Sequence, residues 1–285
     1  MFRLPVTLTM SEITSSRTLS LPALIRVADH AYQSSAYNPL PWNSHAPLWK
    51  GVNLPKACDA FCVAQSITAT PFTSPSSLDH LVVFFHQHST KPNPFTSALQ
   101  VSSFGNSSIT YTNEISTSTS PAISLARLQR TFVRVGPKGP LSFSDPERAI
   151  LQELVDEGLK EDSTPAPPPP LPAATPPTLK EALGVTLARS DVNFGGHVDH
   201  AALAQIALRG IDAVRPEEAP LQFSINYRSQ SKIRDNVVVL VGFDSSDVAS
   251  WEIRQQDTSE VVASGTAGAW LRPSFESEKL LKSKL

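Results

Sequence analysis

Cysteine is scarce in this sequence: Cys58 and Cys62 are the only two among 285 residues. Two thiols cannot build a disulfide framework, and without a second pair of ligands they do not make a zinc site. Their spacing would put both on one face of a helix. We predict two ordinary reduced thiols, as expected of an intracellular protein.

Long hydrophobic runs and an excess of charge of one sign are also missing. The longest apolar runs, such as residues 81–85 and 237–242, are strand-sized and fall short of the ~18 residues that cross a bilayer. The formal net charge is −2, and no stripe of Lys and Arg stands out. We therefore predict a soluble protein with no transmembrane segment and no affinity for nucleic acid.

The first 18 residues allow two interpretations. They contain Arg3, Arg17, several Ser and Thr residues and one acid, Glu12, which loosely suits an organelle-targeting peptide for a mitochondrion or plastid. The alternative is a first strand over residues 3–10. The compartment inside the cell therefore stays open at this point.

A proline-rich segment divides the chain. Residues 167–170 are four consecutive prolines, and proline fixes φ and has no N–H, so this stretch joins neither a helix interior nor a sheet. We predict an extended linker over residues 161–178, between an N-terminal domain (1–160) and a C-terminal domain (179–285). A ligand for a proline-recognition domain is the alternative.

The C-terminal part predicts one long helix among strands. Apolar and small residues recur at helical spacing over residues 201–214, at Leu203, Ile206, Ala207, Gly210 and Ile211. A short helix or turn from residue 179 leads into a strand at 185–188, and four strands follow the helix, at 223–227, 237–242, 251–255 and 261–271. With one helix and no strand–helix alternation, the sheet should be antiparallel and the class α+β.

The N-terminal part repeats this order. A helix is marked by apolar residues at helical spacing, Leu21, Leu24, Ile25, Ala28 and Tyr32. An insertion over residues 38–55 follows, and a closing helix is expected over 145–157. Strands are predicted at 3–10, 61–69, 78–86, 98–104, 108–115 and 123–135. Two copies of the same order predict an internal duplication.

The segment between the C-terminal strand and helix, residues 190–200, is rich in groups that do chemistry. It holds a carboxylate (Asp191), an amide (Asn193), two glycines (Gly195 and Gly196) and His197. The glycines let the backbone turn sharply and approach a ligand. Because a helix starts directly afterwards, backbone N–H groups there lack intrahelical partners, and such a turn suits a carbonyl oxygen that gains negative charge.

This segment resembles the active-site turn of the hotdog-fold thioesterase superfamily. The Asp191-Val192-Asn193 element is similar to acyl-ACP thioesterases, and Gly195-Gly196-His197-Val198 is similar to bacterial acyl-CoA thioesterases. The resemblance implies two tandem hotdog domains, each an antiparallel sheet wrapped around a central helix. It also implies hydrolysis of fatty acyl thioesters to free fatty acid and thiol.

The resemblance assigns roles to individual residues. Asp191 or Asn193 would bind or activate the hydrolytic water, and His197 would orient the water or the carbonyl. Gly195, Gly196 and Val198 would bind the substrate, with the backbone N–H groups of Gly196 and His197 polarising the thioester carbonyl. The substrate would be an acyl-CoA or an acyl carrier protein thioester, with no cofactor.

Two departures from the superfamily's pattern keep other hypotheses open. Asn193 and Gln230 are amides where many members carry acids, and an amide is not a base. The main alternative is a catalytically inactive structural or acyl-binding subunit of a larger assembly, for which a mitochondrion is one candidate compartment; a homodimer is also compatible. A hotdog dehydratase would pair a helix acid with a histidine from another segment, and the sequence does not identify such a pair.

The remaining polar residues have simpler interpretations. We interpret Asp199 as a helix N-terminal charge and His200 as facing solvent or an interface. His80, His86 and His88 lack the acids or thiols that would complete a metal shell, so we expect no metal site. Asp29 and His30 lie past the start of the first helix, where we expect no active site.

Overall fold

The computed structural model describes residues 2–6, 20–37, 60–69, 95–117, 123–161, 177–192, 197–216 and 218–271. The elements of the first half are β1 (Phe2–Val6), α1 (Leu21–Tyr37), β2 (Ala60–Ala69), β3 (Phe95–Phe104), β4 (Ser108–Thr117), β5 (Ser124–Gly136), β6 (Gly139–Pro140) and α3 (Asp145–Glu161). Those of the second half are β7 (Lys180–Thr186), the 3-10 turn η3 (Arg189–Asp191), α4 (His200–Val214), β8 (Ala219–Tyr227), β9 (Asn236–Phe243), β10 (Ala249–Gln255) and β11 (Val261–Leu271).

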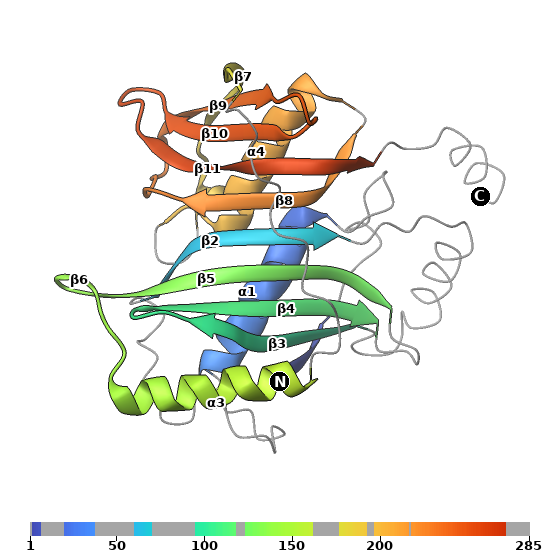
Figure 1. Cartoon of the computed structure of the whole chain (residues 1–285). Helices are drawn as coiled ribbons and strands as arrows, with labels where there is room; N and C mark the ends of the chain where they lie inside the picture. The colour runs from blue at the N-terminus through green and yellow to red at the C-terminus, as the bar shows by residue number, and fades with distance from the viewer. Residues whose placement is uncertain are drawn as a thin grey trace.

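One antiparallel sheet runs through the molecule in the order β1-β3-β4-β5-β2-β8-β11-β10-β9-β7, with β6 paired to β5 (Figure 1). The order is symmetric about its middle: β8 mirrors β2, β11 mirrors β5, and β7 mirrors β1 at the far edge. Direct pairing of β2 with β8 joins the two halves into a continuous sheet. This arrangement confirms the α+β class, the antiparallel sheet and the repeated order of elements.

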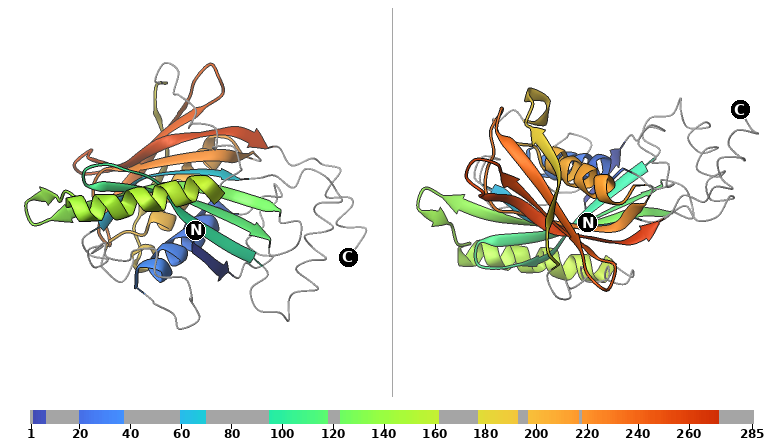
Figure 2. Two further views of the ribbon diagram at one scale, coloured as in Figure 1. Left: turned by 60° about the horizontal axis from the view of Figure 1, so that its bottom comes forward. Right: turned by 90° about the horizontal axis from the view of Figure 1, so that it is seen from above.

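The two central helices lie on the same face of the sheet. Figure 2 shows α1 and α4 on one side and α3 on the other. The described side chains of the apolar stripe of α1 are buried, as are Leu203, Ala207 and Ile211 on the core-facing side of α4. Gly210 brings α4 close to the sheet, because an added Cβ there would lie 2.4 Å from Val239 Cγ1. Helix and sheet therefore share one core in each half.

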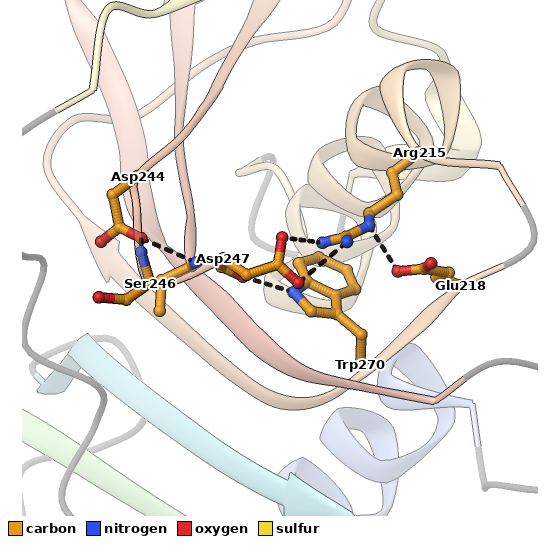
Figure 3. A network of polar contacts seen from close by, with 7 residues as sticks. Arg215, Glu218, Asp244, Ser246, Asp247 and Trp270 are labelled. Atoms are coloured by element: carbon orange, nitrogen blue, oxygen red, sulfur yellow. Dashed lines mark hydrogen bonds and ion pairs between the residues drawn. The ribbon is translucent and has the colours of Figure 1, made fainter.

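The C-terminal end of α4 is tied to the sheet by Arg215. Its guanidinium binds both carboxylate oxygens of Asp247, at 2.8 and 2.9 Å, and also pairs with Glu218 (Figure 3). It lies over the Trp270 ring at 4.7 Å, and the indole N–H donates to the Asp247 carbonyl at 2.6 Å. The helix end, the β9–β10 turn and β11 are thereby held together.

Most elements predicted from the sequence are confirmed, with one correction in the second half. We expected a short helix or turn before a strand at 185–188, but the strand is β7, which begins at Lys180 and ends at Thr186. Lys, Glu, Ala and Gly disfavour strands on their own, but pairing with β9 decides the outcome here. Cys62 lies in β2, so it does not share a helix face with Cys58.

Several sequence predictions fall on residues outside the described ranges. These are Cys58, the insertion at 38–55, the strand at 78–86 with its histidines, and all but the ends of the proline-rich linker. The division into two domains at that linker stays a prediction. Within the described ranges, no helix is both long and apolar enough to cross a membrane.

Candidate active site

The turn between β7 and α4 is closed at its base by backbone contacts. Val192 and Val198 form an antiparallel bridge, and the Asp199 N–H donates to the Asp191 carbonyl at 2.8 Å. The Asp199 carboxylate accepts the Ala201 N–H at 2.8 Å and so caps α4. This confirms the helix N-terminal role expected of Asp199. The two described ends of the motif, Val192 and Val198, therefore lie together just before the positive end of α4.

The residues of the motif have different surroundings. The Asp191 carboxylate accepts the Ala188 N–H at 2.8 Å and the Ser190 hydroxyl at 3.4 Å, so it holds the 3-10 turn in shape. His197 is exposed and Val198 is buried. Asn193, Gly195 and Gly196 lie outside the described residues. Their catalytic and substrate-binding roles therefore stay predictions, and so does the role of His197.

A second group of polar side chains meets where the two halves join. Asp29 from α1 forms an ion pair with Arg130 from β5, whose side chain is only 2% exposed. His200, the first residue of α4, places Nδ1 3.9 Å from Asp29 Oδ1. The His200 ring lies against the Tyr227 ring of β8, with centroids 4.5 Å apart. We call Asp29, Arg130, His200 and Tyr227 the seam cluster.

Burial and nearby charges together set the protonation of the seam cluster and of Cys62 beside it. Burial alone would raise the pKa of Asp29, but Arg130 and His200 outweigh it, and the pKa lies below its ordinary value. Burial raises the pKa of the Cys62 thiol to about 11, against the opposing effect of Arg130. It also raises the pKa of Tyr227 well above its ordinary value. At neutral pH Asp29 is a carboxylate, whereas Cys62 and Tyr227 keep their protons.

Several buried polar atoms in and beside the seam cluster have no hydrogen-bond partner among the described residues. They are both amide atoms of Gln65, Nε and Nη1 of Arg130, and the hydroxyl of Tyr227. Gln65 lies directly opposite Arg130 across β2 and β5. Since buried polar groups are normally satisfied, these atoms suit water or polar groups of a bound molecule. The seam is thus polar inside an otherwise apolar core.

Sequence reasoning did not single out the seam cluster. Asp29 was set aside because it lies past the start of its helix, and His200 was expected to face solvent or an interface. The structure brings the two together at the junction of the halves, 31% of the His200 side chain being exposed. A buried Arg130 in an otherwise alternating strand was the available signal, because a lone inward charge needs a partner.

The described part of the chain holds no group of three or more His, Cys, Asp or Glu residues arranged to bind a metal ion. The described residues place an imidazole, that of His200, beside the Asp29 carboxylate at the positive end of α4.

Comparison with known proteins finds similarity in structure alone. No known family profile matches the sequence, and no curated protein matches it. Among the solved structures that match over nearly the full length of both chains, three are named as thioesterases. A protein named as an oleoyl thioesterase from Lactobacillus plantarum has a TM-score of 0.65 at 14% identity, with 96% of each chain covered.

The other two are named as acyl-ACP thioesterases. The enzyme from Bacteroides thetaiotaomicron gives a TM-score of 0.59 at 11% identity, covering 93% of this chain and 95% of its own. The 12:0-ACP thioesterase from Umbellularia californica gives 0.58 at 11% identity, covering 94% and 96%. Along almost its whole length, this chain has the double-hotdog fold of the acyl-ACP and oleoyl thioesterases.

Proposed function

We propose that this protein hydrolyses fatty acyl thioesters at the turn that opens α4. The observation that carries the proposal is the motif from Asp191 to Val198, positioned at the start of the second central helix of a double hotdog. The full-length likeness to three thioesterases supports it, although identity of 11–14% extends to the fold and not to the reaction.

Thioester hydrolysis needs donors for the oxyanion and a base for water, and the turn offers the first of these. The N–H groups of Gly196 and His197, together with the positive end of α4, would polarise the carbonyl. Asn193 and His197 would hold the water and the substrate. The bond that the Asp191 carboxylate accepts from the Ala188 N–H supports a positioning role for Asp191 in the turn, which leaves the base unassigned within the motif.

The proposed substrates are thioesters of fatty acids with coenzyme A or an acyl carrier protein. The names of the three similar structures motivate this class, and two of them specify the carrier protein. The acyl chain would run beside α4, where the core-facing side chains are apolar.

The test is release of free thiol from a panel of acyl-CoA and acyl-ACP thioesters of graded chain length. We expect wild-type activity on some members of the panel. We also expect H197A to lower kcat by roughly 100-fold or more, as removal of a positioned polar group does. Wild-type protein that is inert across the whole panel contradicts the proposal.

A second candidate function is a non-catalytic acyl-binding or structural subunit of a larger assembly. Asn193 and Gln230 favour it, because both are amides where acids are expected of the thioesterases, and Gln230 is exposed. The two functions separate in one experiment. A subunit of this kind copurifies in a stable complex and binds acyl thioesters without releasing thiol, whereas the enzyme turns them over as a free protein.

A further inference from the structure

We propose that His200, oriented by Asp29 and Arg130, is the group that takes the proton from the hydrolytic water. The inference rests on the proposed thioesterase function and deepens it, because it assigns the base that the motif itself does not securely provide. His200 is the catalytic residue in this assignment, and Asp29 and Arg130 are positioning residues.

His200 and Asp29 come from different halves of the molecule and lie close together. Asp29 is on α1 and His200 begins α4, and the helices contact one another on one face of the sheet. Nδ1 of His200 lies 3.9 Å from Asp29 Oδ1, within ion-pair range. A hydrogen bond is shorter, but catalytic hydrogen bonds are commonly long before substrate binds. A carboxylate on Nδ1 leaves Nε2 unprotonated and available as a base.

Asp29 is itself held in place and kept charged. Arg130 cannot lose its proton, and its side chain is 2% exposed, so Asp29 is the counterion it requires. The charged carboxylate in turn stabilises the imidazolium that forms when His200 accepts a proton. Arg130, Asp29 and His200 therefore form a chain that runs from the buried sheet to the start of α4.

The His200 side chain is accessible from outside the protein. Side-chain exposure of 31% leaves His200 open to a small molecule, while its ring is steadied by the Tyr227 ring 4.5 Å away. His200 follows directly after Asp199, which caps the helix and closes the motif turn. The imidazole thus lies at the N-terminus of α4, whose positive end is proposed to help polarise the carbonyl.

The other groups around His200 do not serve as bases. The Cys62 thiol and the Tyr227 phenol are protonated at neutral pH, and Arg130 is a cation. The Asp199 carboxylate is occupied by the helix N-terminus. Asp29, whose Oδ1 lies 3.9 Å from Nδ1 of His200, is therefore the acid that orients the imidazole.

The proposed hydrolysis consumes one water molecule and regenerates neutral His200. A water oxygen attacks the thioester carbonyl carbon while Nε2 of His200 accepts one of its protons. The carbonyl π electrons move to the oxygen, which the N–H groups at the start of α4 stabilise. Collapse of this intermediate restores the carbonyl and breaks the C–S bond, and the imidazolium returns the proton to the leaving thiolate. The products are a carboxylic acid and a thiol, and His200 ends neutral.

The test compares H200Q with a matched control, H30Q, in the full chain. His30 follows Asp29 on α1 and is exposed, so the control makes the same change outside the cluster. We expect H200Q to lower kcat by roughly 100-fold or more with little change in KM. It should also lose the rise of kcat/KM with pH that deprotonation of an imidazole produces. H30Q should behave as wild type.

A second variant, D29N, guards against a merely structural effect of the first. Assayed below its own melting temperature, D29N should lower kcat and leave KM largely unchanged, because the carboxylate acts through His200. H200Q that keeps wild-type kcat and pH profile overturns the inference while the thioesterase function stands. Wild-type protein that releases no thiol overturns both. A third outcome is that the wild-type protein releases no thiol but hydrates a 2-enoyl thioester, and that H200Q loses this hydration. That result overturns the hydrolytic role in favour of a dehydratase.

Discussion

What an acidic side chain does in this protein is decided by what its oxygens already accept. Asp199 and Asp191 accept backbone N–H groups and shape the turn before α4. Glu147 accepts the Ser144 N–H and hydroxyl and an Arg134 N–H, each at 2.7 Å, and so caps α3. Asp29 instead pairs with a buried arginine and faces an imidazole. Of these four acids, Asp29 is the one placed to influence proton transfer.

Glu147 supplies a prediction about stability and pH. Burial alone would raise the pKa of Glu147, but the hydrogen bonds from Ser144 and the ion pair with Arg134 outweigh it and lower the pKa. A lowered folded pKa contributes stability that is present above the unfolded value of about 4.3 and is lost as pH falls through the folded value. E147Q should therefore reduce the free energy of unfolding in urea by about 1 kcal/mol at pH 7, and the difference should shrink below about pH 4.

E153Q is the matched control for this prediction, because Glu153 is an exposed acid on the same helix. It makes the same change of charge without removing a capping interaction, so its unfolding free energy should stay close to wild type at both pH values. Equal effects of the two variants would show that net charge, not the cap, governs the stability of α3.

Among the helices and strands, sequence periodicity predicted the type of most elements, whereas pairing and packing set where some of them begin and end. The alternation of Phe223, Ile225 and Tyr227 predicted β8, and the helical spacing from Leu203 to Ile211 predicted α4. The predicted position of β7 was wrong because its residues have weak strand propensity. The strand forms by pairing with β9, a distant partner that a local sequence pattern does not contain. Gly210, one of the small residues of α4, allows the helix to pack closely against Val239 of β9.

Gly210 supplies the prediction at this scale. Alanine in a helix interior normally gains about 1 kcal/mol over glycine, but an added Cβ at Gly210 would lie 2.4 Å from Val239 Cγ1 and 2.8 Å from its Cβ. We expect the clash to win and G210A to lower the free energy of unfolding by about 1–3 kcal/mol in urea. The double variant G210A/V239A should lose less than the sum of its single changes, because the smaller side chain removes the clash.

The control for this prediction is G184A in β7, where an added Cβ would meet nothing within 4 Å. This variant should be neutral or slightly stabilising, since alanine restricts the unfolded chain. If G210A were as well tolerated as G184A, α4 would be free to move away from β9, and the close approach would not be a requirement of the fold.

At the scale of the molecule, the candidate site is assembled by the junction of the two halves. The motif could be read from the sequence because its residues are contiguous. The seam cluster could not, because Asp29, Arg130 and His200 come from three distant segments that only the β2–β8 pairing and the α1–α4 contact bring together. The duplicated fold thus places one acid of the first half, Asp29, against the start of α4 in the second.

The ion pair at this junction supplies the last prediction. D29A leaves Arg130 charged in a site where 2% of its side chain is exposed, so it should cost about 3–5 kcal/mol of unfolding free energy. R130M removes that charge and leaves Asp29, which is 25% exposed and costs less to leave unpaired. The double variant D29A/R130M should therefore be more stable than D29A, giving a coupling energy of about 2 kcal/mol or more. The pair Glu252–Arg254 provides the matched cycle. Its arginine is 37% exposed where Arg130 is 2% exposed, so this pair should couple by under about 1 kcal/mol. Equal coupling in the two cycles would mean that Asp29 and Arg130 do not hold the halves in register, and that the orientation of His200 depends on the packing of α1 against α4 alone.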